Sequence, residues 1–164
     1  MKVSEAESTV GTGRSARADR DLWTCPRCGR TFANRNQTHT CSPIGDLDRH
    51  FAGADPDVRR SFDVIVHALG ALTILPEKSR IALHVRMSFA AFQPRKHWLD
   101  GHLVLPREAT HPLFRRVQVF SARNVLHEFR INAPGDIDAA FLALCREAYE
   151  VGEQRHLDRP TEGG

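Results

Sequence analysis

Residues 78–90, KSRIALHVRMSFA, decide the fold class, because apolar and polar side chains alternate along them. In an extended chain, one face of this segment would carry only apolar residues, namely Ile81, Leu83, Val85, Met87 and Phe89. A period of two predicts a β-strand that buries one face and exposes a polar one. Similar patterns predict strands over 97–105, 115–120 and 125–131, hairpin connections at 93–95 and 121–124, and a short edge strand near 73–75.

A helix is predicted on each side of these strands in the sequence. Asp55 suits an N-cap and Pro56 the first helical position, and apolar residues at helical spacing then predict a helix over about 56–71. A second helix is predicted over about 136–153, with two aspartates in its first turn. The strand connections are too short for parallel crossovers. We therefore predict an α+β fold: an antiparallel sheet of four to five strands with flanking helices, preceded by a small zinc-knuckle module.

The zinc-knuckle module is predicted from the spacing of cysteine and histidine. Cys25-Pro-Arg-Cys28-Gly is followed by His39-Thr-Cys41, which gives the pattern C-x2-C-x10-H-x-C. Zinc takes four nitrogen or sulfur ligands in a tetrahedron, and two side chains at i and i+2 of an extended segment point to one side. We predict one structural Zn²⁺ ion, held by Cys25, Cys28, His39 and Cys41.

Two alternatives to this ligand set are open. A redox dithiol would need a neighbouring strand–helix unit, which this short segment lacks. His50 competes with His39 for the fourth position. The loop of ten residues between Cys28 and His39 is too short for a helix that reads three bases of DNA, so the metal is predicted to act as a folding staple.

Composition divides the rest of the chain. Residues 1–20 are polar and rich in Ser, Gly and Arg, which predicts a disordered tail, and a second such tail is expected over 158–164. The zinc module then spans 21–43 and the α+β domain 44–157. No signal peptide and no apolar run of about 20 residues stands out, and the cysteines do not resemble a disulfide scaffold. We expect a bacterial cytoplasmic protein without a membrane partner; no pattern indicates an oligomeric state.

Charge is distributed unevenly along the chain. Residues 73–130 hold ten Lys or Arg against four Asp or Glu, whereas residues 131–164 hold three against seven. A basic face suits a phosphate or a carboxylate. The alternative is a solvated polar face that prevents aggregation. The candidate ligand-binding residues are Lys78, Arg80, His84, Arg86, Arg95, Lys96, His127 and Arg130, with Asp100 and His102 as neighbours.

The chain resembles a bacterial family catalogued as domain of unknown function 5655. The resemblance lies in LWTCPRCGRTFANRNQTHTC (22–41), LDRHFAG (47–53), PEKSRIALHVRMSFA (76–90), HPLFRRV (111–117) and DIDAAFLALCREAYEVG (136–152). It implies a small α+β domain that sometimes carries a zinc-binding head. It implies no activity and no substrate.

These observations favour a binding module that holds nucleic acid or a phosphate-bearing ligand on a basic sheet face. A protein-interaction adaptor that docks through the zinc head is an alternative. A small-ligand or catalytic domain with His84, His127 and Arg80 around a pocket is another. No nucleophile is tied to these histidines by a motif, and Cys145 falls on the apolar stripe of the last predicted helix, so we name no catalytic residue and an enzyme is the less favoured class.

Overall fold

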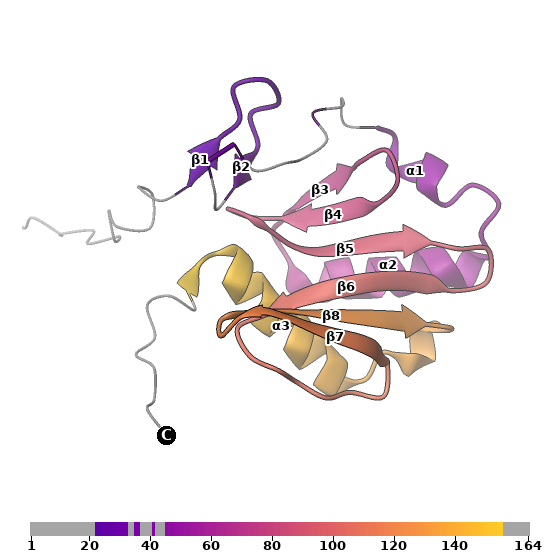
Figure 1. Cartoon of the computed structure of the whole chain (residues 1–164). Helices are drawn as coiled ribbons and strands as arrows, with labels where there is room; N and C mark the ends of the chain where they lie inside the picture. The colour runs from indigo at the N-terminus through magenta and orange to yellow at the C-terminus, as the bar shows by residue number, and fades with distance from the viewer. Residues whose placement is uncertain (1–21, 33–34, 37–40, 42–44, 156–164) are drawn as a thin grey trace, which may run out of the picture.

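The computed structural model describes residues 22–32, 35–36, 41 and 45–155 (Figure 1). Two short strands come first, β1 (Trp23–Thr24) and β2 (Thr31–Phe32), and they pair antiparallel. Two helices follow, α1 (Leu47–His50) and α2 (Pro56–Leu69). The remaining elements are β3 (Thr73–Pro76), β4 (Ile81–His84), β5 (Ser88–Pro94), β6 (Leu99–Leu105), β7 (Phe114–Ser121), β8 (Asn124–Ile131), the 3-10 helix η1 (Pro134–Asp136) and α3 (Ala139–Gly152).

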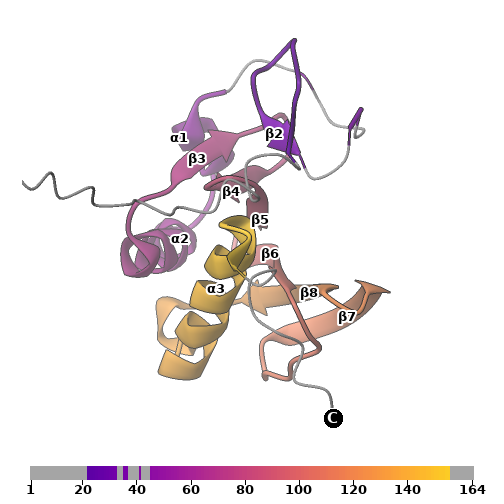
Figure 2. The same ribbon diagram turned by 90° about the vertical axis from the view of Figure 1, so that its left-hand side faces the viewer.

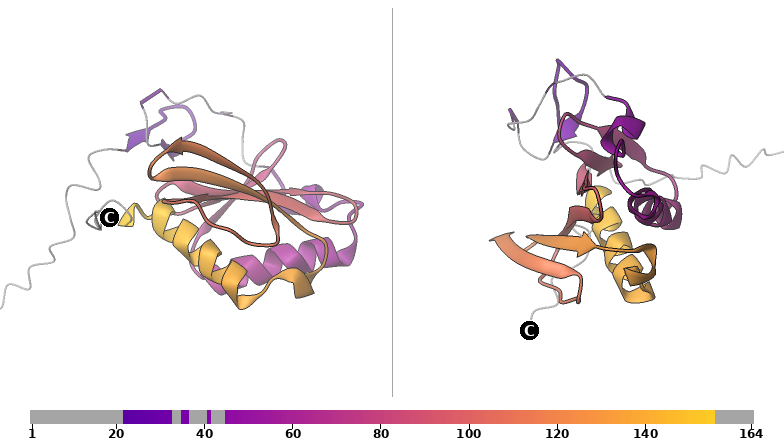
Figure 3. Two further views of the ribbon diagram at one scale, coloured as in Figure 1. Left: turned by 60° about the horizontal axis from the view of Figure 1, so that its bottom comes forward. Right: turned by 90° about the vertical axis from the view of Figure 1, so that its right-hand side faces the viewer.

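The main sheet confirms the α+β class, with six strands rather than four to five. Its order is β3-β4-β5-β6-β8-β7, and every neighbouring pair is antiparallel. Helices α2 and α3 both lie against the same face of this sheet (Figure 3). The core between them is closed by fully buried aromatic rings, among them Phe62, Phe92 and Phe141. The other face, turned away from both helices, is called the open face below.

The prediction of one strand over residues 78–90 was wrong, because the chain turns at 85–87 and forms the hairpin of β4 and β5. The backbone N–H of Val85 donates to the carbonyl of Met87, and the N–H of Met87 donates to the carbonyl of Gly152 at the end of α3. This tertiary hydrogen bond fixes the turn. Residues 93 and 94, predicted to form a connection, are instead the last residues of β5, and the turn to β6 follows them.

Residues next to the two long helices determine where α2 ends and where α3 begins. Gly70, with φ of 81°, ends α2 in a conformation that disfavours side chains with a Cβ atom. Helix α3 begins at Ala139, later than the predicted 136, because Asp138 is its N-cap and accepts a hydrogen bond from the Phe141 N–H. Asp136 belongs to η1, where it accepts the N–H groups of residues 132 and 133.

The pair β1–β2 and the residues around it, 22–32 with 35–36 and 41, form what we call the head. The head contacts the main sheet at the end of β3 and beside the β4–β5 turn. The guanidinium of Arg30 lies 2.6 Å from the Glu77 carboxylate, and the Thr31 hydroxyl donates to the Arg86 carbonyl. The predicted tails, 1–20 and 158–164, lie outside the described residues. Within the described chain, none of the helices combines the length and apolarity that crossing a membrane requires.

Candidate metal centre and sheet pocket

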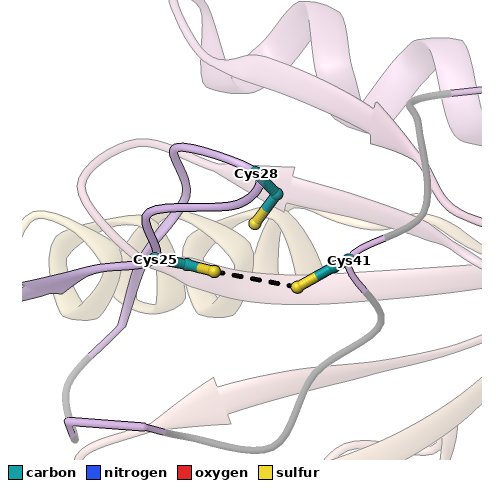
Figure 4. A group of neighbouring side chains, drawn as sticks. All are labelled: Cys25, Cys28 and Cys41. Carbon is teal, nitrogen blue, oxygen red and sulfur yellow. Dashed lines mark hydrogen bonds between the residues drawn. The ribbon is translucent and has the colours of Figure 1, made fainter.

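Three cysteines of the head converge on one point (Figure 4). The sulfur atoms of Cys25, Cys28 and Cys41 all lie within 4.8 Å of one another, and the Cys25 and Cys41 sulfurs are 3.7 Å apart. Thiolates about 2.3 Å from a tetrahedral ion would be about 3.8 Å apart. The Cys25–Cys41 distance therefore matches two corners of a metal tetrahedron, and all three sulfurs are close enough to hold one ion. None of them forms a disulfide in this structure.

The turn between β1 and β2 holds two of these cysteines in place. The Gly29 N–H donates to the Cys25 carbonyl at 2.8 Å, and the Cys25 N–H donates to the Arg30 carbonyl at 2.9 Å. Gly29 has φ of 71°, which a residue with a Cβ atom rarely adopts. This explains why a glycine follows Cys28 in the sequence.

The surroundings of Cys25 favour its thiolate. Burial opposes ionisation of this thiol, but hydrogen bonds from the backbone N–H groups of Arg27 and Cys28 and from the neighbouring thiols outweigh it and lower the pKa of Cys25 to about 6. Burial and the adjacent Cys25 raise the pKa of Cys41 instead. An ionised Cys25 sulfur beside two further sulfur atoms is the arrangement that a thiophilic metal ion would complete.

The fourth ligand position is not settled by these three sulfurs. His39, the predicted ligand, lies outside the described residues. His50 is described, and it is not part of the cluster; among the residues that the structure describes, the three cysteines are the one group with metal-ligand spacing. Cys145 is fully buried in α3, and burial raises the pKa of its thiol to about 12, so it is a core residue.

The predicted basic residues do not form one continuous face. Four of them lie in turns: Lys78 between β3 and β4, Arg86 between β4 and β5, and Arg95 and Lys96 between β5 and β6. His84 ends β4, where its Nδ1 lies 3.2 Å from the Ser88 hydroxyl, and burial and then the charge of Arg30 lower its pKa.

The placement of His127 on the polar face was wrong. Its side chain is 0% exposed and pairs in register with Leu103 on the core side of the sheet. The ring accepts a hydrogen bond at Nε2 from the Ala109 N–H and packs against Phe114. A histidine engaged in this way is a satisfied core residue, and burial lowers its pKa.

Two of the predicted residues, Arg80 and Arg130, do come together around a pocket of about 370 Å³ on the open face. We call it the sheet pocket. Its polar lining residues are Arg80, Gln93, Asp100, His102, Arg115, Glu128 and Arg130. Arg115 and Glu128 were missed as site residues, because only the strand register places them beside the others. In register, Glu128 pairs with His102 on one side and with Arg116 on the other.

Arginines outnumber carboxylates around this pocket. Asp100 accepts from Arg130 at 2.8 Å and from Arg95 at 3.3 Å, and also from the Trp98 indole at 3.1 Å. Burial acts to raise the pKa of the Asp100 carboxyl group, but these donors outweigh it and lower the pKa. Arg130 also lies over the Trp98 ring, 4.5 Å from its centroid.

A second carboxylate beside the pocket is shared in the same way. Glu77 binds Arg30 through one oxygen at 2.6 Å and Arg80 through the other at 2.7 Å. Each of the two carboxylates is thus shared by two guanidinium groups, which leaves a surplus of positive charge. Burial and then the charge of Arg80 lower the pKa of His102 to about 4, so this ring is neutral at pH 7.

Comparison with protein families gives one match. Residues 48–152 match the family described as Domain of unknown function (DUF5655). No curated protein and no solved structure matches the chain. The match spans α2, the six-stranded sheet and α3, which include the sheet pocket, and it leaves out the three clustered cysteines. Because it covers more than half of the sequence, the chain belongs to the DUF5655 family.

Proposed function

We propose that this chain is a zinc-stapled binding module for a phosphate-bearing partner. One Zn²⁺ ion is held by Cys25, Cys28, Cys41 and His39. The observation that carries this proposal is the convergence of three thiols within 4.8 Å, at the spacing of a tetrahedral site. The free thiols also favour a reducing compartment such as the cytoplasm.

The role of the ion in this proposal is structural. Four protein ligands leave no open position for a substrate or a water molecule. The described head has two strands of two residues each, and the rings of Trp23 and Phe32 are in contact between them. Such a small unit has almost no core, so metal binding would supply most of its folding free energy.

The partner is proposed from the surplus of guanidinium groups on the main sheet. Asp100 and Glu77 are each shared by two arginines, and this leaves net positive charge on the open face. Arginine binds phosphate, as it binds carboxylate, through two parallel N–H donors. Nucleic acid and a small phosphorylated molecule both carry that group. Among the described residues, no catalytic constellation supports an enzyme.

The metal proposal is tested by metal analysis of the purified full-length chain. We expect one zinc per chain in the wild type and in His50→Ala, and clearly less than half in Cys25→Ser and in His39→Ala. His50→Ala is the control, because that histidine lies outside the sulfur cluster. Loss of zinc from His50→Ala, or full zinc in His39→Ala, would assign the fourth position differently.

The partner proposal is tested by fluorescence anisotropy with labelled single-stranded DNA, double-stranded DNA and RNA of random sequence. Binding through the arginine surplus should weaken steeply as salt rises from about 50 to 200 mM, because phosphate contacts release counterions. Binding without a salt slope, or no binding to any phosphate-bearing probe at low salt, would contradict the proposal.

A further inference from the structure

The sheet pocket lies on the open face of the main sheet, which bends between β5 and β8. In Figure 2 strands β8 and β7 turn away from the plane of β3 to β5, and α2 and α3 lie on the opposite side. Arg80 comes from the β4 side and Arg115 from edge strand β7, so they approach the hollow from its two sides. A volume of about 370 Å³ is at the small end of the range for ligand pockets.

We propose that the sheet pocket binds a small phosphomonoester that also carries hydroxyl groups, as a sugar phosphate does. This inference rests on the proposed function, because it names the kind of phosphate-bearing ligand and the place where it binds. The argument depends on which groups of the pocket are already engaged within the protein and which are not.

The register of the strands builds the floor of the pocket. Ala91 on β5, His102 on β6 and Glu128 on β8 are direct neighbours across the sheet. Gln93, Asp100 and Arg130 form the adjacent row. The small Ala91 side chain leaves space beside the His102 ring, and the two rows present polar groups toward that space.

The row that contains Asp100 and Arg130 is hydrogen-bonded within the protein through its side chains, whereas the row that contains His102 and Glu128 is not. Asp100 is saturated by three donors, and Arg130 is held by Asp100 and by the Trp98 ring. In contrast, no hydrogen bond or ion pair within the described ranges engages the side chains of His102, Glu128 or Arg115. Three polar side chains that line one hollow and make no such contact are available to bind a ligand there.

The chemistry of these groups narrows the ligand. Arg115 and the N–H groups of Arg80 that Glu77 does not engage are cationic donors for a phosphate. The neutral His102 ring offers one donor and one acceptor. Glu128 is acceptor-only and would repel a bare anion, so the same ligand must also carry hydroxyl donors for it. A metal ion is a poorer fit, because the other carboxylate of the lining, Asp100, is engaged by three donors. Among the described residues, it does not form a group with metal-ligand spacing with His102 and Glu128.

The proposal is tested by isothermal titration calorimetry of the zinc-loaded full-length protein. The probe is ribose 5-phosphate, with ribose and inorganic phosphate as comparators that each lack one half of the ligand. We expect ribose 5-phosphate to bind at least about tenfold more tightly than either comparator. Equal affinity for all three probes, or no binding of ribose 5-phosphate, overturns the proposal.

Two substitutions test the assigned groups. Arg115→Gln should weaken ribose 5-phosphate binding by about tenfold or more, because it removes a charged hydrogen-bond donor. Glu128→Gln should weaken binding of ribose 5-phosphate but leave that of inorganic phosphate unchanged or stronger, since it removes both the hydroxyl acceptor and a repelling charge. The matched control is Arg146→Gln, an exposed arginine on α3. An effect of Arg115→Gln no larger than that of the control also overturns the proposal.

These results separate the pocket from the broader proposal. If nucleic acid binds with a salt slope and ribose 5-phosphate does not bind, the pocket inference fails and a phosphate-binding face stands. If ribose 5-phosphate binds and responds to Arg115→Gln while nucleic acid does not bind, the pocket inference is supported and nucleic acid is excluded as the partner. Zinc content, measured on the same samples, reports on the metal proposal alone.

Discussion

Replacing Gly101 by alanine is expected to destabilise the domain strongly, because a Cβ atom has no room there. Gly101 lies in β6, between the pocket residues Asp100 and His102, and pairs in register with Phe129. A Cβ atom built on Gly101 would be 2.5 Å from the Phe129 ring and 2.7 Å from the carbonyl oxygen of Ala91. Both distances are below any ordinary carbon contact.

Neither contact can be relieved by a simple side-chain rotation. The Phe129 ring is itself packed against Phe92 and Phe141, with ring centroids 5.7 and 5.1 Å away. The Ala91 oxygen belongs to the backbone of β5, which is paired with β6, so a shift would disturb the sheet. Overpacking of a core costs about 1–3 kcal/mol, and a backbone clash places Gly101→Ala near the upper end. For a domain of this size, that corresponds to a fall in Tm of about 10 °C.

The assay is thermal unfolding followed by circular dichroism, with urea unfolding for the free energy. Gly135→Ala is the matched control, because a Cβ atom at Gly135 has nothing within 4 Å, and we expect its stability within about 0.5 kcal/mol of the wild type. If Gly101→Ala melts within about 2 °C of Gly135→Ala, the close packing of β6 against Phe129 is refuted, and with it the register that places the pocket residues.

After removal of metal with a chelator, the three thiols of the head should react quickly with a thiol reagent, while the fully buried Cys145 should react only after unfolding. Equal reaction rates for all four thiols would contradict this arrangement. Stability should fall as the pH is lowered from about 6.5 to about 4, since the pKa of His102 is lowered to about 4 and the unfolded chain therefore binds more protons in that range. Urea unfolding at several pH values should give a smaller fall for His102→Asn, and an unchanged fall would exclude this histidine. Arg30→Met and Glu77→Gln each break an ion pair whose side chains are only 9% and 13% exposed, and each should lower the free energy of unfolding by about 3 kcal/mol. The double variant should lose less than the sum of the two single losses. Strict additivity in urea unfolding would show that the two side chains do not interact.

Much of the fold could be predicted because its signals are local. Asp55-Pro56 marked the start of α2, and the alternation over 125–131 marked β8. The turn at 85–87 could not be predicted, because alternation continues through it and its stabilising hydrogen bond comes from Gly152, far along the chain. Period two indicates extended backbone, but it does not indicate where a hairpin turns.

The cysteine cluster and the sheet pocket differ in the same respect, because only the cluster has a local signal. Two of the three cysteine ligands are separated by two residues, so their spacing alone predicted the cluster. The pocket depends on strand register, which brings His102 beside Glu128 from distant parts of the sequence. The core position of His127 does have a local signal, because this residue alternates in step with the apolar Val125, Phe129 and Ile131 and so lies on the same face of β8. That pattern alone indicates a core position, and the positive charge of the surrounding segment obscured it.

The head and the sheet pocket are electrostatically connected, although the family match begins at residue 48, after the head. Glu77 receives Arg30 from the head and Arg80 from the pocket. Without Arg30, the Glu77 carboxylate would neutralise Arg80 alone, and the pocket would have one positive charge fewer at its edge. Because this pair is mostly buried, solvent would screen the change only weakly. If the sheet pocket binds an anion as proposed, the head would therefore contribute to that binding through Glu77, without touching the ligand.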